Sequence, residues 1–556
     1  MRSSRMTALV VVIAGVLSVV LVGCDSNGGG TQGTGGDGGA QVLVWGAEQE
    51  PPALNNWTNS GNTVWTGIVT TPVLQSLMIY KPDFSYEPQL LARLPELISE
   101  SPQVARYELD PNAAWDDGSP VTADDVQATL DAVLNPDSDV VSRLGYDLIV
   151  GGKLSGVSPD KKQFTIEFAE PFTPWRELFT SSNQPLLKAS ALQGADFNTF
   201  MNDRIPFASG PYRFKSWTKG SDLTLEVNPN YWDSPAAVIP ELDFRFMPEA
   251  ETQLKNLDSS EVQVIYPQPQ PEIVSQLAAM EGVDFSALFG PQWEHVDYNL
   301  TNPMLAETSV RQALNYMVDR ELIAERVARP VDGSAQVLQN VVYVPSQAEY
   351  EEHWQVFRQD FDRAAQLLQG AGYSKGSDGV WQKDGQRLSF AISTTTDNPA
   401  REDTEEILIE AWRQGGVEVK TDNYPADVLF ERIPTCQYEI ALFAYQAGPD
   451  PFGSNGVYRG DDIACPGAGG IEGGQNTTAI NDPAVTDLLD RTDAELDPAK
   501  RADVYNQVDA ALVQNPPTLP LYQKATVLAW RQGVQGLEDN PTIQGPTWNS
   551  QDWRFS

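Results

Sequence analysis

The sequence predicts a fold of the mixed α/β class. Segments in which apolar and polar residues alternate, as in strands, are interleaved along the chain with segments of helical spacing. This order favours α/β domains over an all-β sandwich. No repeat of fixed period runs through the 556 residues, which excludes solenoids and fibres. The chain is long enough for two or three domains of about 100 to 200 residues each.

Local patterns predict the individual strands and the first clear helix. Alternation bounded by turn residues predicts strands over residues 104–109, 163–168, 222–227, 387–393 and 439–443. A helix is expected after Ser309, because Ser309 and Gln312 have the spacing of a capping box and apolar residues follow at helical intervals.

Two further helices have clear boundary signals. One is expected to start with Asp497 as its N-cap and Pro498 in its first turn, and to stop at residues 516–517, which are both proline. The other spans residues 361–369 and ends at Gly370. These helices complete the alternation that predicts the α/β class.

The first 24 residues have the features of a bacterial lipoprotein signal. Arg2 and Arg5 precede an apolar run over residues 8–22, and Gly23 and Cys24 close it. In such signals the cysteine is lipidated and becomes the new N-terminus. A plain transmembrane anchor is the alternative, but the run is shorter than the roughly 20 residues that cross a bilayer. We therefore expect export and lipid anchoring through Cys24 at the outer face of a bacterial cytoplasmic membrane.

Residues 25–40 are predicted to be a flexible tether. Glycine dominates this segment, and none of its side chains can start a core. Folded structure is expected to begin near residue 41.

The charge balance argues against a nucleic-acid partner. The chain has 37 basic and 76 acidic residues, a formal net charge of −39, and such a surface repels polyanions. The acids are spread along the chain, which is typical of a solubilising surface.

Two cysteines remain after Cys24. Cys436 and Cys465 would meet an oxidising environment in an exported protein, and we expect them to form a disulfide. The alternative is a pair of free, buried cysteines.

Several segments, read in order, resemble one family. Residues 115–126 have the spacing of a turn that delivers a capped helix: Asp117 and Gly118 form the turn, and Thr122 is the cap. With this segment, the family resemblance is carried by residues 209–214, 228–232, 310–314, 364–373, 482–483 and 517–522. The chain resembles the solute-binding proteins for peptides, dipeptides and nickel that serve ABC importers.

The resemblance implies a two-lobed, periplasmic-binding-protein-like α/β fold with an extra α/β domain on the first lobe. Two chain crossings, near residues 291–302 and 515–522, would act as hinges. The implied boundaries are 41–77, 205–295 and 515–556 for lobe I, 78–204 for the extra domain and 296–514 for lobe II.

The resemblance also implies where a ligand is held. The N-terminal part of the pocket corresponds to residues 50–57, from which we choose Asn55 and Trp57, with a core position as the alternative for Trp57. The other wall corresponds to residues 438–455, in which Tyr445, a core residue in the alternative reading, and Gln446 are candidates together with Phe452.

One departure from the family pattern affects the ligand. Peptide binders place an aspartate where this chain has Ala447 or Gly448. Asp450 is then either a displaced partner of the ligand ammonium or the cap of a turn before Phe452. Tyr458 and Arg459 follow, and Arg459 is a candidate for a ligand carboxylate.

Catalytic motifs are missing from the sequence. Two histidines leave few general bases and no multi-histidine metal site, and no nucleophile elbow or phosphate-binding loop occurs. These absences argue against an enzyme, and the family resemblance implies a receptor that captures oligopeptides or dipeptides and delivers them to an ABC permease. We expect it to be monomeric and to hold no cofactor or metal. The alternatives are an oligosaccharide or glycopeptide binder, a lipid-anchored cell-envelope hydrolase, and a receptor that reports to a membrane sensor.

Overall fold

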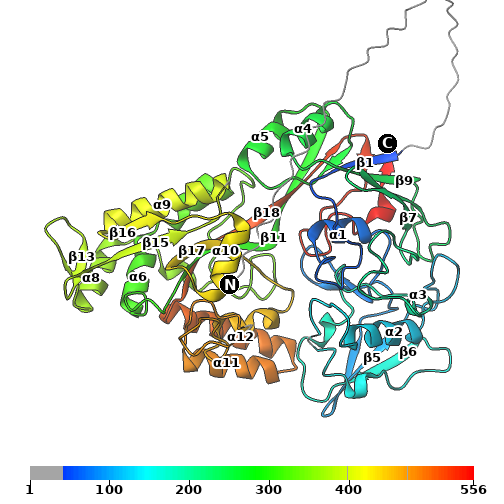
Figure 1. Ribbon diagram of the computed structural model, residues 1–556, viewed down its shortest axis with the longest axis horizontal. Coiled ribbons are helices and arrows are strands. Elements are labelled where there is room, and N and C mark those ends of the chain that lie inside the picture. The colour runs from blue at the N-terminus through cyan, green and yellow to red at the C-terminus, as the bar shows by residue number, and fades with distance from the viewer. Residues whose placement is uncertain (1–41, 144, 397, 472–473) are drawn as a thin grey trace, which may run out of the picture. The chain divides into compact units, whose positions relative to one another are not determined.

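A sheet of ten strands is the centre of the computed structural model, which describes residues 42–556 except residues 144, 397, 472 and 473. The strand order is β16-β15-β17-β11-β18-β10-β1-β9-β8-β7. β11 (Val283–Tyr298) and β18 (Thr518–Arg531) are its longest strands and pair antiparallel. We call this pair the crossing ribbon. The other strands lie to either side of it, and they form a first and a second lobe (Figure 1).

The first lobe is built around the strand that follows the N-terminal segment. β1 (Val42–Ala47) lies between β9 and β10 and is parallel to both. It is buried almost without alternation, as expected for a strand covered on both faces. The other elements of this lobe are β7 (Tyr212–Thr218), β8 (Asp222–Val227), β9 (Glu241–Phe246), β10 (Val264–Ile265), β19 (Val534–Gln535), β20 (Arg554–Phe555), α1 (Val64–Thr70), α4 (Ala250–Asp258) and α5 (Pro271–Ala279).

Residues 78–204, which we call the additional domain, pack against the first lobe. Their buried side chains belong to the same hydrophobic cluster as those of β1, so the two parts share one core. The elements are β2 (Met78–Tyr80), β3 (Tyr86–Pro88), β4 (Glu96–Glu100), β5 (Gln103–Glu108), β6 (Gln163–Glu167), α2 (Ala123–Leu134) and α3 (Ala189–Leu192).

The predicted cap of α2 is confirmed. Gly118 has φ 79° in the turn before the helix. The Thr122 hydroxyl accepts a hydrogen bond from the Asp124 N–H at 3.3 Å, and the Thr122 N–H donates to the Asp125 carboxylate at 2.9 Å. Two N–H groups that the helix leaves unpaired are satisfied in this way.

The second lobe has its own hydrophobic cluster. Three strands extend its side of the sheet, and helices cover them (Figure 1). These strands are β15 (Ser389–Ser393), β16 (Glu418–Thr421) and β17 (Ile440–Gln446). A separate small sheet of this lobe consists of β12 (Ser374–Lys375), β13 (Trp381–Lys383) and β14 (Gln386–Arg387). The helices are α6 (Thr308–Met317), α7 (Arg320–Ile323), α8 (Phe361–Gly370), α9 (Pro399–Gly415), α10 (Ala426–Arg432), α11 (Pro483–Ala494) and α12 (Pro498–Gln514).

Two of the helix-boundary predictions in this lobe are confirmed and one is wrong. Asp497 caps α12, and α8 has the predicted extent. The capping box of α6 is absent, because the helix starts after Glu307 without a side-chain cap. Gln312 instead donates a hydrogen bond to the main-chain oxygen of Gln514 in α12 at 2.8 Å. The side chain that the local pattern assigned to the N-terminus of α6 is therefore used in a contact between two helices.

The alternation expected over residues 439–443 is also absent. Ile440, Ala441, Leu442 and Phe443 are all buried. β17 lies between β15 and β11 in the sheet and is covered on both faces, and such strands are apolar without interruption.

The additional domain also contacts the second lobe. Phe84, in the loop between β2 and β3, belongs to the hydrophobic cluster of the second lobe. Phe172 meets Phe452 edge to face with ring centroids 5.8 Å apart. The lobes therefore contact each other at a place other than the crossing ribbon.

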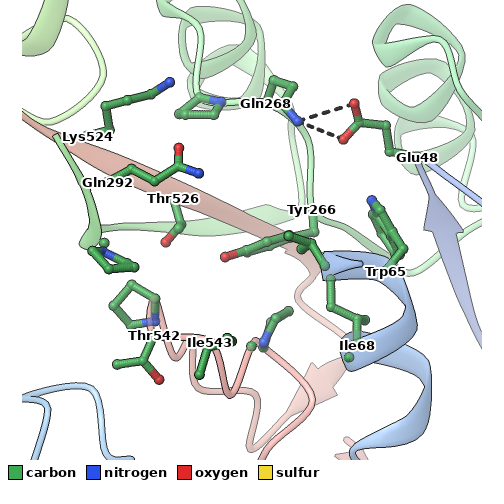
Figure 2. A pocket seen from close by; sticks show the side chains of 18 of the residues that line it. Glu48, Trp65, Ile68, Tyr266, Gln268, Gln292, Lys524, Thr526, Thr542 and Ile543 are labelled. Carbon is green, nitrogen blue, oxygen red and sulfur yellow. Dashed lines mark hydrogen bonds between the residues drawn. The ribbon is translucent and has the colours of Figure 1, made fainter. Parts of the chain in front are cut away.

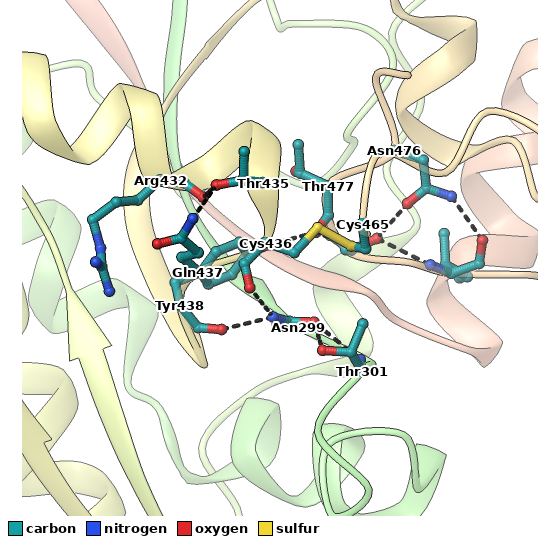
Figure 3. The surroundings of a disulfide bond; sticks show 12 residues. Asn299, Thr301, Arg432, Thr435, Cys436, Gln437, Tyr438, Cys465, Asn476 and Thr477 are labelled. Atoms are coloured by element: carbon teal, nitrogen blue, oxygen red, sulfur yellow. Dashed lines mark hydrogen bonds between the residues drawn. A yellow bond between two sulfur atoms is a disulfide. The ribbon is translucent and has the colours of Figure 1, made fainter. Parts of the chain in front are cut away.

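A disulfide joins Cys436 to Cys465, with 5.1 Å between the Cα atoms. Beside it the Asn299 side-chain amide donates to the main-chain oxygens of Cys436 at 2.9 Å and Tyr438 at 2.7 Å (Figure 3). The bond ties the start of β17 to the loop that follows the strand.

The pairing of β11 with β18 shifts register at two places near the middle of the crossing ribbon, between Phe289 and Trp293 and between Glu294 and His295. We call the first of these the break in the ribbon. In this break the main-chain oxygen of Gly290 accepts a hydrogen bond from the Gln523 side chain at 2.7 Å. One predicted hinge, residues 291–302, overlaps this break, while the other, 515–522, ends just before Gln523.

The predictions for residues 1–41, including the signal and Cys24, fall outside the part of the chain that the structure describes. Within the described part, no helix combines the length and apolarity needed to cross a membrane.

Candidate functional site

A cavity of about 550 Å³ lies beside the break in the crossing ribbon, within the size range of small-molecule sites. Most of its wall belongs to the first lobe and the ribbon, and Gln446 at the end of β17 comes from the second lobe. The lining side chains labelled in Figure 2 are Glu48, Trp65, Ile68, Tyr266, Gln268, Gln292, Lys524, Thr526, Thr542 and Ile543.

A second cavity of about 450 Å³ continues the first toward the second lobe. The residues that line both are Gln268, Pro269, Gln292, Lys524 and Ala525. A separate hollow of about 610 Å³ is lined only by residues near β1, β8 and β9. The two connected cavities, which we call the cleft, are walled by both lobes, and we choose them as the candidate site.

Helix α1 supplies the apolar part of the first cavity. The Thr63 hydroxyl accepts a hydrogen bond from the Thr66 N–H at 3.1 Å and caps the helix. Trp65 and Ile68 follow three residues apart and therefore lie on one face, which faces the cavity (Figure 2). Val64 lies at the cavity and is largely exposed.

A cluster of three charged side chains lies at the second cavity. Arg401 donates three hydrogen bonds of 3.0 to 3.2 Å to the Glu294 carboxylate. The Lys524 ammonium lies 3.3 Å from the same carboxylate. Burial alone would raise the pKa of Glu294, but Lys524 and Arg401 lower it below its usual range. Glu294 is therefore ionised, and the cluster carries one surplus positive charge.

Polar side chains hold the rest of the wall in place. The Gln268 amide donates to the two carboxylate oxygens of Glu48 at 2.9 and 3.2 Å (Figure 2). The Thr526 hydroxyl donates to Asp539 at 2.7 Å. Burial raises the pKa of Asp539 to about 6. Oriented amides and hydroxyls of this kind give a ligand site its specificity.

Asn55 and Trp57 lie in the core of the first lobe and the additional domain. The Asn55 amide donates to the main-chain oxygen of Phe197 at 2.8 Å, and the Trp57 indole donates to that of Pro185 at 2.9 Å. Both side chains are buried, and neither lines the cleft. The chain reaches the cleft a few residues earlier, at Glu48.

Gln446 is the predicted residue that lines the cleft. Tyr445, its neighbour, points the other way: its hydroxyl donates to Asp297 at 3.0 Å, and its ring stacks on His295 at 4.1 Å. The alternation of a strand separates these two side chains.

Asp450 has the geometry of a turn cap. Its carboxylate accepts a hydrogen bond from the Phe452 N–H at 3.0 Å and forms an ion pair with Arg501. It lines a small cavity of about 100 Å³ between the additional domain and the second lobe. Phe452 packs against Phe172 in the same contact.

Tyr458 and Arg459 lie away from the cleft. Tyr458 is buried in the second-lobe cluster. Arg459 forms ion pairs with Asp490, at 2.6 Å, and Asp493. Like the rest of the predicted set, their role in ligand binding stays a prediction.

The cleft residues that local patterns missed come from segments far apart in the sequence. Glu48 follows β1, Arg401 lies in α9 and Lys524 lies in β18. The one sequence signal near them is the predicted hinge, since Gly290 and Pro291 interrupt a long strand and line the cavity. Segments that cross between lobes are the places where a cleft can be walled by both.

In the part of the chain that the structure describes, no group of three or more His, Cys, Asp or Glu side chains is placed to hold a metal ion.

The fold defines a class of protein. Two α/β lobes joined by a pair of crossing strands, with an additional domain on the first lobe, form the two-lobed architecture of periplasmic binding proteins, as predicted. The model of bacterial extracellular solute-binding proteins, family 5 Middle, matches residues 85–462. The chain belongs to this family, whose members are ligand receptors of ABC importers.

Relatives and solved structures agree with this assignment. The chain is 25% identical to the oligopeptide-binding protein OppA of Mycobacterium tuberculosis, over 88% of this chain and 82% of that protein. It is 22% identical to the dipeptide-binding protein of Escherichia coli, over 90% and 93%.

Two structures with the same fold show the range of solutes. The periplasmic EDTA-binding protein EppA has a TM-score of 0.81 at 23% identity, covering 93% of this chain and 97% of that chain. The oligopeptide-binding protein AppA of Bacillus subtilis, in complex with a nonapeptide, has a TM-score of 0.70 at 19% identity, covering 93% and 99%.

Proposed function

We propose that the protein is an extracytoplasmic receptor that captures oligopeptides or dipeptides between its lobes and delivers them to an ABC permease. The observation that carries the proposal is the cleft beside the break in the crossing ribbon, with Gln446 from one lobe and Glu48 from the other. A ligand that contacts both lobes favours the closed conformer, and the permease can recognise that conformer. The ligand leaves without covalent change.

The choice of peptides rests on the names of the relatives. Several relatives are named for oligopeptides or dipeptides. Solved neighbours include binders of EDTA and of a nickel–histidine complex. Peptides are preferred here because the cleft combines amide side chains, which can bond to a peptide main chain, with apolar side chains.

We also propose that the receptor is a monomer anchored by lipid at Cys24. The signal pattern in the first 24 residues supports the anchor. A chain with Cys24→Ser should be released from membranes into the soluble fraction, while the unchanged chain sediments with them. Equal sedimentation of both would contradict the anchor.

Thermal unfolding in the presence of candidate solutes tests the receptor function. A true ligand at 100 times its dissociation constant adds about 2.7 kcal/mol to the unfolding free energy. We expect mixtures of short peptides to raise the melting temperature, and oligosaccharides and metal chelates to leave it unchanged. Stabilisation by sugars or chelates alone would contradict the peptide assignment. Turnover of any bound solute would contradict the receptor function.

A further inference from the structure

The first cavity has one charged side chain of each sign. Among the described residues that line it, Glu48 is the only acid and Lys524 is the only base. No ion pair joins them, and Gln268 lies between them in the view of Figure 2. The chain as a whole has 76 acidic and 37 basic residues, so this balance differs from that of the molecule.

The Lys524 ammonium has hydrogen-bond donors that no acceptor among the described residues uses. Within the described part of the chain its one ionic contact is with Glu294, and that carboxylate already accepts three hydrogen bonds from Arg401. An ammonium has three donors, and no other acceptor for Lys524 is found among the described residues. Its side chain is 23% exposed and lines both cavities of the cleft. The free donors are available to an anionic group inside the cleft.

Glu48 lies at the C-terminal end of β1 and has no cationic partner among the described residues. Its carboxylate accepts hydrogen bonds from the Gln268 amide, which orients it without neutralising it. The side chain is half-buried, and a carboxylate with a fixed orientation and remaining lone pairs is a good partner for a cation.

The wall beyond these two charges is mixed. Trp65 and Ile68 from α1 and Ile543 from a loop give it apolar surface, and Gln292 and Thr526 from the ribbon give it amide and hydroxyl groups. Where such a wall shields an ionic contact from water, the contact is strengthened, and a ligand that leaves either charge unpaired is penalised.

We propose that the cleft selects zwitterionic ligands, with the anionic group of the ligand at Lys524 and its cationic group at Glu48. This inference rests on the proposed receptor function and specifies its ligand as a free, unblocked short peptide. It places the partner of the ligand ammonium at the end of β1, while Asp450, in the loop after β17, is paired with Arg501.

The test compares blocked and unblocked ligands on the full mature chain. Equimolar mixtures of short peptides are offered with free ends, with amidated C-termini and with acetylated N-termini, and the retained peptide is measured by mass spectrometry. ε-Aminocaproate serves as a zwitterion without a peptide bond. We expect free peptides to be retained roughly ten- to a hundredfold better than either blocked form, the range of a charge-assisted hydrogen bond.

Variants assign each end of the ligand. Lys524→Met should abolish the preference for a free carboxylate, and Lys524→Arg should keep it. Glu48→Gln should abolish the preference for a free amino group. Lys255→Met and Glu261→Gln, two exposed positions outside the cleft, are the matched controls and should behave as the unchanged chain.

The outcomes separate the two proposals. Equal retention of blocked and free peptides would overturn the zwitterion inference and leave peptide capture intact. Preferences that survive in Lys524→Met or Glu48→Gln would also overturn it. Retention of ε-aminocaproate without any peptide would support the charge assignment and refute peptides as the solute. Retention of neither zwitterion would overturn the inference.

Discussion

Asp450 illustrates how much of a residue's role depends on its neighbours. The resemblance to peptide binders made it a candidate partner for a ligand ammonium, with a turn cap as the alternative. In the structure its carboxylate is occupied by Arg501 and the Phe452 N–H. Asp450 also lies close enough to Glu177 to raise the pKa of that carboxyl. Two acids from different domains therefore meet beside Arg501.

Glu177 makes stability depend on pH. Burial, and then Asp450, raise its pKa to about 7, although the hydroxyls of Tyr80 and Tyr86 donate to it and Arg501 lies nearby. An acid with a raised pKa favours the folded state when it is protonated, so its contribution is complete below the unfolded pKa of about 4.5 and is lost as the pH rises through about 7. We expect the unfolding free energy to fall on the order of 2 kcal/mol over this interval.

Urea unfolding between about pH 5 and pH 8 checks this dependence. Glu177→Gln removes the titrating group, so the variant should lose this part of the pH dependence and be more stable than the unchanged chain at the upper limit. Glu170→Gln, at an exposed position of the same domain, should not alter the profile. A profile that is the same with and without Glu177 would refute the assignment.

At the scale of elements, a local sequence pattern predicts a helix cap correctly where the bonded residues are neighbours in the chain. The Thr122 cap of α2 and the Asp497 cap of α12 involve residues within a few positions of each other, and both were predictable. The α6 capping box was not formed, because Gln312 bonds to Gln514, 202 residues away.

Replacing the two candidate caps should separate these cases. Thr122→Ala removes a capping hydroxyl and should lower the unfolding free energy by about 1 kcal/mol. Ser309→Ala is the matched control, since Ser309 does not cap α6, and it should change stability by no more than a few tenths of a kcal/mol. Urea unfolding measures both. Equal losses would mean that Ser309 does act at the helix terminus.

The disulfide closes a loop with a sequence separation of 29. Replacing both cysteines by serine frees this loop in the unfolded chain. In the chain-entropy model this lowers the unfolding free energy by roughly 3 to 4 kcal/mol. The double variant Cys436→Ser with Cys465→Ser should therefore unfold at lower urea concentration.

The unchanged chain under reducing conditions is the control for this experiment and should match the double variant. An unfolding midpoint unaffected by both treatments would show that the bond does not stabilise the fold. Ligand retention by the double variant would report whether the start of β17 must be tied for Gln446 to hold its place.

At the scale of the whole molecule, the lobes meet at the crossing ribbon and again at Phe84. Phe84 comes from the additional domain and packs into the core of the second lobe. If the lobes separate on ligand release, this side chain leaves its apolar site and enters water. The contact would then contribute to the free-energy difference between the closed and open conformers.

Phe84→Ala should therefore weaken ligand retention. Full burial of a phenylalanine side chain is worth about 1.5 to 3 kcal/mol, so the dissociation constant of a captured ligand should rise roughly ten- to a hundredfold. Phe84→Leu keeps most of the apolar area and should retain most of the affinity. Titration calorimetry with the best-retained ligand measures both. An unchanged constant in Phe84→Ala would indicate that the contact is not broken on opening.

The α/β class, the positions of five strands and two of the helix boundaries were determined by the sequence alone. The ordered motifs from residue 115 to residue 522 were also enough to identify the family. These features are recorded in short patterns, because turns, caps and strand alternation depend on residues that are neighbours in the chain.

The walls of the cleft were decided only by the tertiary structure. Glu48, Arg401 and Lys524 carry no local signal, and they approach one site because β1, α9 and β18 meet at the crossing ribbon. The role of each charge depends on its neighbours: Glu294 is shared by two cations, while Glu48 has no cationic partner among the residues that the structure describes. Coulomb interactions depend on distance and burial in space, and a sequence pattern contains neither.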